Sequence, residues 1–222
     1  MTAHTPADLQ RIYGARFTSN LHYRKRVWAA LVAHWFGRYV RSADAVLDLG
    51  CGYGEFINAV TCRAKFAMDL NPDAPAFLAA DVTFLAQDCS ERWPLADESL
   101  DVVFTSNFFE HLPDKTALGR TLDEIRRCLR RGGRLIALGP NIKYLPGQYW
   151  DFWDHYIPLT ETSLKEALVT RGFAVEVCLG RFLPYTMASG PQYPIAFLRA
   201  YLALPAAWRF FGKQFLVVGV RS

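Results

Sequence analysis

The sequence contains no uninterrupted apolar run of about 18 residues, the length that a membrane-spanning helix requires. Its start, Met-Thr-Ala-His-Thr-Pro-Ala-Asp, is polar and lacks the apolar core of a secretory signal. Internal repeats and low-complexity tracts are also absent. These absences argue against a transmembrane segment, an exported protein and a repeat architecture.

Cysteine is sparse, and no two cysteines form a Cys-x-x-Cys pair or stand beside a group of histidines. The five are widely spaced, at Cys51, Cys62, Cys89, Cys128 and Cys178. An odd number without a secretory leader favours reduced thiols in the cytoplasm. No group of side chains has the spacing of metal ligands, so we expect no metal.

Charge is modest, with a formal net charge of +4 and 21% charged residues. The one dense basic run, Arg126, Arg127, Arg130 and Arg131, precedes two glycines. Cations there complement the dipole at a helix C-terminus, whereas a nucleic-acid surface would need a broader basic face. We therefore expect no nucleic-acid partner. A chain of 222 residues that is 51% hydrophobic has enough apolar side chains for one core, which predicts a single domain.

The most informative segment is an apolar run that starts at Ala45 and opens into Gly50, Gly52 and Gly54. Such a run predicts a buried parallel strand, and the glycines let the backbone turn sharply and approach a ligand. The dinucleotide fingerprint has its third glycine one position later, where this chain has Glu55. An acid there would repel a pyrophosphate at the helix N-terminus but not a cationic sulfonium ligand.

The segment Val46-Leu-Asp-Leu-Gly-Cys-Gly-Tyr-Gly54 resembles the cofactor motif of class I S-adenosylmethionine-dependent methyltransferases. The resemblance extends over about residues 44–180. It implies S-adenosyl-L-methionine as the cofactor and S-adenosyl-L-homocysteine as the product. It also implies an α/β fold, a doubly wound, mostly parallel seven-stranded sheet of Rossmann-like form with a final antiparallel strand.

The order of apolar runs and helical periodicities agrees with such a fold. We predict strands over 45–50, 65–70, 83–88, 100–107, 133–139, 173–179 and 214–221. Helices are predicted over 21–39, 55–63, 114–131, 161–170 and 194–204, with Ser163 and Glu166 as a capping box and Pro205 as a helix breaker. The domain 1–222 then comprises an N-terminal helical segment (1–43), a cofactor-binding core (44–180), a substrate-cap insertion (181–213) and a last strand (214–222). The aromatic and basic stretch 11–17 is a candidate cover for the cofactor cleft.

Acidic residues stand where three predicted strands end. Asp48 would brace the glycine loop and the methionyl amino group, or would only cap local amides. Asp69 lies nineteen residues past Gly50, the distance at which an acid binds ribose hydroxyls in dinucleotide folds; alternatively, it begins a turn. The resemblance assigns Asp88 to the adenine amino group.

The resemblance places the rest of the cofactor site beside these strand ends. The predicted cofactor-binding residues are Asp48, Gly50, Cys51, Gly52, Gly54, Asp69, Leu70, Asp88, Cys89, Ser106 and Asn107. Of these, Ser106 and Asn107 would line the sulfonium, and Leu70 either flanks the adenine or belongs to the core.

Candidate acceptor residues crowd the segment 144–156, which carries six aromatic residues. Here His155 is a candidate general base, oriented by Asp154 or Asp151; alternatively, the aromatics pack helix 161–170 and His155 caps it. The element Glu110-His111-Leu112 resembles one in the small-molecule branch that includes quinone-biosynthesis methyltransferases. There His111 either braces the loop or touches the acceptor. The predicted acceptor-binding residues are Tyr149, Trp150, Trp153, Tyr156 and Tyr185.

The segment 190–212 is rich in aromatic residues and leucine and carries Arg199 and Arg209, with Lys213 just beyond. This composition suits an apolar acceptor pocket or contact with a membrane surface. Internal packing is the simpler explanation.

These observations predict methyl transfer from S-adenosylmethionine to a small-molecule or lipid-linked acceptor, with oxygen as the favoured accepting atom. A first alternative is a non-catalytic S-adenosylmethionine-binding partner subunit. A second, a nicotinamide-dependent reductase, is disfavoured by Glu55 and by the lack of a Tyr-x-x-x-Lys pair. The identity of the acceptor and the oligomeric state do not follow from the sequence.

Overall fold

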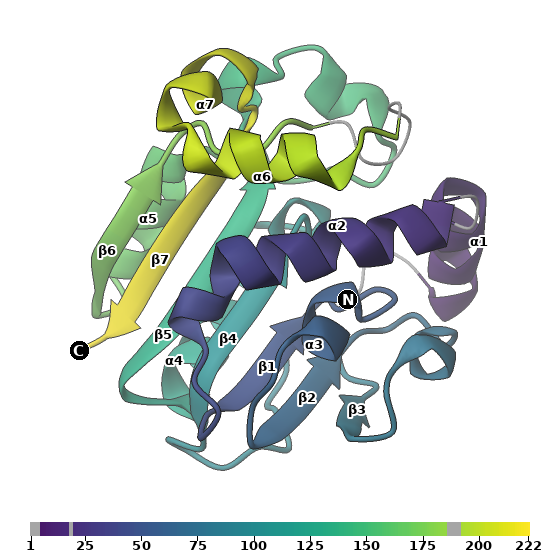
Figure 1. Ribbon diagram of the computed structural model, residues 1–222. Coiled ribbons are helices and arrows are strands. Elements are labelled where there is room, and N and C mark those ends of the chain that lie inside the picture. The colour runs from purple at the N-terminus through teal and green to yellow at the C-terminus, as the bar shows by residue number, and fades with distance from the viewer. Residues whose placement is uncertain (1–4, 18–19, 186–191) are drawn as a thin grey trace.

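A computed structural model describes residues 5–17, 20–185 and 192–222. Its seven strands form one sheet in the order β3-β2-β1-β4-β5-β7-β6 (Figure 1). The strands are β1 (Ala45–Leu49), β2 (Ala64–Met68), β3 (Val82–Leu85), β4 (Leu100–Ser106), β5 (Leu129–Pro140), β6 (Phe173–Leu179) and β7 (Gln214–Arg221). Only β7 runs antiparallel to its neighbours, β5 and β6. The predicted doubly wound, mostly parallel seven-stranded fold is confirmed.

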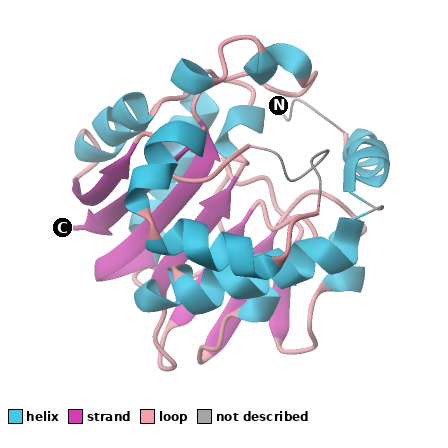
Figure 2. Ribbon diagram, turned by 45° about the horizontal axis from the view of Figure 1, so that its top comes forward, coloured by secondary structure: helices cyan, strands magenta, loops and turns pink. Residues whose placement is uncertain are grey.

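Helices cover both faces of this sheet (Figure 2). The α-helices are α1 (Pro6–Phe17), α2 (Leu21–His34), α3 (Glu55–Ala59), α4 (Lys115–Cys128), α5 (Glu161–Val169), α6 (Ile195–Ala203) and α7 (Pro205–Phe211). The 3₁₀ helices are η2 (Phe36–Tyr39), η3 (Ala74–Phe77), η4 (Phe109–His111), η5 (Ile142–Tyr144) and η6 (Gln148–Asp151). One apolar core lies between the sheet and helices α4 and α5, and a second lies between the opposite face and α2, α3, α6 and α7.

The parallel strands end together at one edge of the sheet. Leu49, the last residue of β1, pairs with Met68 of β2 and with Thr105 of β4. Strands β1 to β4 end one to three residues before their predicted ends. The predicted acids at positions 48, 69 and 88 therefore lie at the end of β1 or in the loops just beyond β2 and β3, where ligands bind in open α/β sheets.

Several helices differ from their predicted extents. The first long helix ends at His34, and a separate 3₁₀ turn follows, because Trp35 leaves helical geometry with φ at −138°. Helix α3 stops at Ala59, because Val60 is extended and packs in the second core. Pro205 ends one helix, as predicted, but it also begins α7, where a proline loses no hydrogen bond.

The basic run belongs to two elements rather than to one helix end. Helix α4 stops at Cys128, so Arg126 and Arg127 lie in its last turn while Arg130 and Arg131 lie in β5. The guanidinium of Arg127 is 2.6 Å from the Glu124 carboxylate and 2.6 Å from Asp97.

The predicted capping box at α5 is wrong in register. Thr160 is the N-cap residue: its hydroxyl accepts from the Ser163 backbone N–H at 3.1 Å, and the Ser163 hydroxyl accepts from the Thr160 N–H at 3.0 Å. Serine takes the place of the usual glutamate at the third helical position, because its hydroxyl reaches the backbone N–H of the N-cap residue.

Replacing Thr160 by alanine should therefore lower the free energy of unfolding by about 1 kcal/mol, the usual cost of a lost N-cap. The matched change Glu166→Ala, at the position that the sequence predicted as the second half of the box, should leave stability within about 0.5 kcal/mol. Urea unfolding of both variants is the measurement. Equal losses would mean that the cap seen here is not the stabilising one.

The insertion before β7 packs against the N-terminal part of the chain through α6, which lies beside α2 (Figure 1). The Tyr193 backbone N–H donates to the Tyr23 hydroxyl at 3.1 Å, and the Gln192 side chain donates to Asn20 at 2.8 Å. Residues 186–191 of the insertion lie outside the described residues. Within the described ranges, no helix combines the length and apolarity needed to cross a bilayer.

Candidate functional site

The glycine loop after β1 requires its glycines. Gly50, Gly52 and Gly54 have φ values of +67°, +54° and +69°, in the left-handed region that side chains disfavour. A Cβ atom on Gly50 would lie 2.3 Å from the Phe108 ring. The Gly50 N–H donates to the carbonyl of Met68 at 2.9 Å, which joins the loop to the end of β2.

Three buried carboxylates surround this loop: Asp48, Glu55 and Asp69. Asp48 accepts a hydrogen bond from the backbone N–H of Ile57 at 3.3 Å. The two oxygens of Asp69 accept from the N–H groups of Gly52 and Asn71, each at 2.8 Å. Asp69 therefore fixes the loop as well as facing the strand ends.

The surroundings of Asp48 and Asp69 disfavour the charged forms of their carboxyl groups. Burial raises the pKa of Asp48 well above its ordinary value, and the charges of Glu55 and Asp69 raise it further. Burial likewise raises the pKa of Asp69, against the lowering effect of its N–H donors. Glu55 forms an ion pair with Arg24 of α2 at 2.8 Å. A positive charge beside this loop would favour the ionised carboxylates, so the loop is electrostatically suited to a cationic ligand.

The neighbouring strand end adds polar groups. Asn107, just after β4, has a φ of +51°, an unusual value that clusters at functional sites. Its side-chain nitrogen donates to the Ser106 hydroxyl at 3.0 Å. Its side-chain oxygen is buried and accepts no hydrogen bond from any described residue. A ligand donor at this edge would satisfy that oxygen.

The other predicted cofactor residues are more dispersed. Asp88 lies three residues beyond β3, and one of its oxygens accepts from the N–H and the hydroxyl of Ser90, both at 2.9 Å. Cys89 is buried with its sulfur 3.3 Å from the Thr121 hydroxyl, and burial raises the pKa of its thiol to about 12. Cys51 is buried within the glycine loop, whereas Leu70 is half-buried.

The predicted cover 11–17 forms the later part of α1. This helix is tied to the loop beyond β2 by a hydrogen bond of 2.8 Å from Gln10 to Asp73. Its role over the cofactor remains a prediction.

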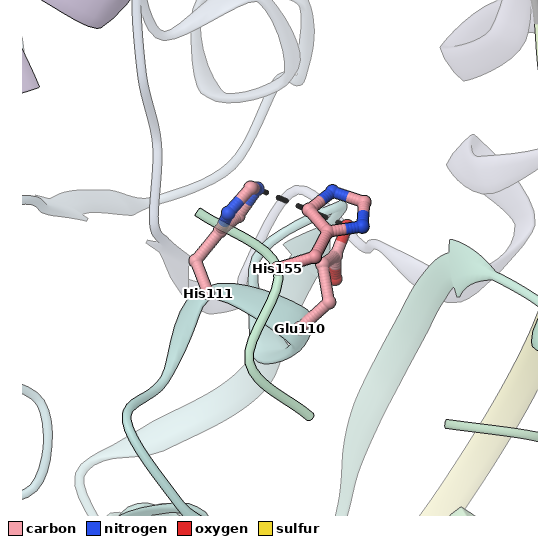
Figure 3. A group of neighbouring side chains, drawn as sticks. All are labelled: Glu110, His111 and His155. Carbon is pink, nitrogen blue, oxygen red and sulfur yellow. Dashed lines mark ion pairs between the residues drawn. The ribbon is translucent and has the colours of Figure 1, made fainter. Parts of the chain in front are cut away.

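A second polar group lies after β4, where η4 meets the segment that follows η6. The carbonyl of Glu110 accepts from the N–H groups of Tyr156 and Ile157, at 2.8 and 3.2 Å. His111 has Nδ1 2.8 Å from the Asp154 carbonyl and 3.2 Å from its carboxylate. The rings of His111 and His155 are 4.9 Å apart (Figure 3).

Burial and the neighbouring charges shift the pKa values of Glu110 and His111 in opposite directions. Burial raises the pKa of Glu110 to about 7, although the neighbouring His111 lowers it. Burial alone would lower the pKa of His111, but the hydrogen bond to Asp154 and the charges of Glu110 and Asp154 raise it above its usual value. Perturbed titration of this kind is frequent at functional sites.

His155 is buried among aromatic rings. It stacks on Phe152 at 4.9 Å and meets the edge of Tyr149 at 4.8 Å. The alternative in which His155 caps α5 is wrong, because Thr160 is the cap. The Asp154 carboxylate lies 3.2 Å from Nδ1 of His111, while its predicted role in orienting His155 remains a prediction.

The predicted acceptor residues separate into two environments. Tyr149 is fully buried, and its hydroxyl donates to the Ile157 carbonyl and accepts from the Leu159 N–H. Tyr185 meets the edge of Phe152 at 5.8 Å. In contrast, Trp150, Trp153 and Tyr156 are exposed, with Trp153 at 85%. Their role in acceptor binding remains a prediction.

Two features escaped the sequence analysis. The Arg24–Glu55 pair joins residues whose adjacency no local pattern reveals. The second is the grouping of Glu110, His111 and His155, whose potential ligand atoms lie within 4.8 Å of one another, although no metal was expected. The proximity of Glu110 to His111 was visible in the sequence, but His155 lies 44 positions away.

The comparisons with known proteins agree with this geometry. A family model described as a methyltransferase domain matches residues 47–137. A probable S-adenosylmethionine-dependent methyltransferase of Mycolicibacterium smegmatis is 33% identical over 165 residues, covering 67% of this chain and 63% of that protein. The chain belongs to the class I S-adenosylmethionine-dependent methyltransferases. The cofactor of this family is S-adenosylmethionine, and its product is S-adenosylhomocysteine.

One further curated protein and one solved structure are also similar to this chain. The malonyl-[acyl-carrier protein] O-methyltransferase of Methylococcus capsulatus is 35% identical over 143 residues, covering 58% of this chain and 51% of that protein. A solved S-adenosylmethionine-dependent methyltransferase from Archaeoglobus fulgidus shares the fold, with a TM-score of 0.67 and 21% identity over 89% of this chain and 94% of that one. The chain spans about three fifths of the length of the curated relatives that it matches first.

The residues at the strand ends fit S-adenosylmethionine. Its sulfonium and ammonium groups are cations, which suit the three buried acidic groups around the glycine loop. The buried side-chain oxygen of Asn107, which accepts no hydrogen bond from the described residues, could accept one from the cofactor.

Proposed function

We propose that this protein transfers a methyl group from S-adenosylmethionine to an oxygen of a small-molecule or lipid-linked acceptor. The observation that carries the proposal is the acid-rich glycine loop beside the group of Glu110, His111 and His155, because these two parts would hold the donor and the acceptor. The O-methyltransferase of Methylococcus capsulatus supports oxygen as the accepting atom.

Asp69 would hold the ribose. A carboxylate has about four lone-pair sites, and the N–H groups of Gly52 and Asn71 take two of them. The remaining sites can accept from two hydroxyls without breaking the loop. Asp48 would face the methionyl amino group, and Asp88 would accept from the adenine amino group.

When bound, S-adenosylmethionine supplies an electrophilic methyl group, which the acceptor takes as the sulfonium becomes a neutral thioether. Positive charge is dispersed in this displacement, so the protein contributes mainly alignment and exclusion of water. The segment 149–157 would provide that enclosure, because Tyr149 and His155 fix it against η4 from inside.

A lipid-linked acceptor is supported by the surface of α6 and α7. Residues 192–213 contain no acidic residue but include Arg199, Arg209 and Lys213. The rings of Phe210 and Phe211 are 79% and 65% exposed. Exposed aromatics beside cations are typical of segments that contact the interface of an anionic membrane. This surface would bring the protein to acceptors held in a bilayer.

The proposal is tested by calorimetry followed by transfer assays. We expect the protein to bind S-adenosylhomocysteine and to label one class of acceptor with methyl-tritiated S-adenosylmethionine, tested on phenolic, carboxylic and vesicle-embedded lipid substrates. Tight NAD(P) binding without S-adenosylhomocysteine binding would overturn the assignment. Binding without transfer to any class would instead favour the non-catalytic partner subunit.

Binding should also release protons. In the free protein, burial raises the pKa values of Asp48 and Asp69, and the charges of Glu55 and Asp69 raise that of Asp48 further, so both acids hold a proton to higher pH than an ordinary aspartate does. The positive charges of S-adenosylmethionine favour the ionised forms. Calorimetry in two buffers of different ionisation enthalpy should show proton release at acidic pH that becomes smaller at higher pH, where the two acids are more fully ionised before binding. Proton uptake at the lower pH would contradict this electrostatic account.

A further inference from the structure

Glu110, His111 and His155 form a convergent set of metal-ligating groups outside the cofactor loop. The first two come from η4 and the third from the segment after η6 (Figure 3). One ligand atom from each lies within 4.8 Å of the others. The two segments are held together by the hydrogen bonds from the N–H groups of Tyr156 and Ile157 to the Glu110 carbonyl.

The hydrogen bonds of His111 decide which nitrogen is available. Its Nδ1 lies 2.8 Å from the Asp154 backbone carbonyl, and because a carbonyl can only accept, Nδ1 carries a proton. Neutral His111 therefore presents the lone pair of Nε2. That atom lies 3.9 Å from Oε1 of Glu110, too far for a hydrogen bond (Figure 3).

The Glu110 carboxylate needs a partner of its own. The residue is 1% exposed, and its Oε1 accepts no hydrogen bond from any residue that the structure describes. A buried carboxylate oxygen without a donor is costly. This oxygen points toward Nε2 of His111, the position where a bound cation would compensate it.

We propose that Glu110, His111 and His155 bind one divalent transition-metal ion, with Zn²⁺ preferred. Two imidazoles and one carboxylate are the ligand set of catalytic zinc sites that keep a position open, whereas Mg²⁺ prefers oxygen ligands. Asp154 would be a positioning residue that holds His111 by Nδ1, as carboxylates hold metal-bound histidines elsewhere.

The role of the ion in catalysis rests on the proposed function. An acceptor hydroxyl at the open position of the ion would lose its proton to water more readily than a free hydroxyl. The resulting oxygen anion would then form the new C–O bond as the C–S bond breaks. Binding of the ion itself can be measured without any acceptor.

Titration of the chelator-treated full-length protein with Co²⁺ is the test. We expect one Co²⁺ per chain, with visible d–d absorption that Zn²⁺ abolishes. His155→Ala should weaken Co²⁺ binding by about 100-fold or more, and Asp154→Asn by about 10- to 100-fold. The matched control is His22→Ala, which removes an exposed histidine and should change nothing.

Circular dichroism and S-adenosylhomocysteine binding establish that each variant is folded. Wild-type protein that takes up no Co²⁺ overturns the proposal, even if a variant fails to fold. So does uptake that His22→Ala abolishes and His155→Ala leaves intact, which would place the ion at the surface. In either case, retained S-adenosylhomocysteine binding would leave the proposed methyl transfer standing.

Discussion

Asp69→Asn should weaken binding of S-adenosylhomocysteine by about 1–3 kcal/mol, or roughly 5- to 150-fold, the range for a buried hydrogen bond to a charged group. The side chain keeps its size but has one oxygen instead of two. It can no longer accept from the N–H groups of Gly52 and Asn71 and also from two ribose hydroxyls.

The control for Asp69 is Asp81→Asn. Asp81 is an exposed acid that pairs with Lys65 at 2.9 Å and lies before β3, away from the strand ends that form the site. Its replacement should leave affinity for S-adenosylhomocysteine unchanged. Isothermal calorimetry of both variants decides the matter: a dissociation constant for Asp69→Asn within twofold of the wild type would remove Asp69 from the cofactor site.

Gly50→Ala should lower the free energy of unfolding by about 2–4 kcal/mol, because two penalties add. The left-handed backbone costs about 1–2 kcal/mol for a residue with a side chain, and the new Cβ atom would lie 2.3 Å from the Phe108 ring. Since about 1 kcal/mol moves the melting temperature by about 2–4 °C in a chain of this size, a loss of roughly 4–16 °C is expected in a thermal scan.

Gly132 supplies the matched control for this steric argument. It has a similar φ of +74°, but a Cβ atom there would meet nothing within 4 Å. Gly132→Ala should therefore show the backbone penalty alone. Adding Phe108→Ala to Gly50→Ala should recover part of the stability by removing the clash. If Gly50 and Gly132 variants melt alike, the ring of Phe108 does not constrain the loop.

The sequence was sufficient for the fold because its strongest signals are local. The apolar runs at β6 and β7 match the structure to the residue; β6 lies between Gly172 and Gly180, and β7 begins just after Lys213. The residues at which helices begin and end were less predictable. The true N-cap at Thr160 and the stop of α3 at Ala59 depend on hydrogen bonds and burial that the sequence pattern does not record.

In the candidate site, too, the parts formed by contiguous residues were predictable and the parts formed by distant residues were not. The glycine loop and Asp69 could be found from spacing, because strand, turn and helix are contiguous there. The grouping of Glu110 and His111 with His155 could not, because it depends on how the segment after β5 folds back onto η4. The contact of Asp154 with His111 was likewise not predicted, because it depends on the same fold of the segment after β5.

The position of β7 has a consequence for how the chain is made. This strand enters the sheet between β5 and β6 and bonds to both. Until residue 221 has emerged from the ribosome, β5 and β6 therefore have unpaired edges. Unpaired strand edges can pair with other chains and lead to aggregation. Nascent protein stalled before this point should depend on chaperones, whereas a chain that includes β7 pairs both strands in one step.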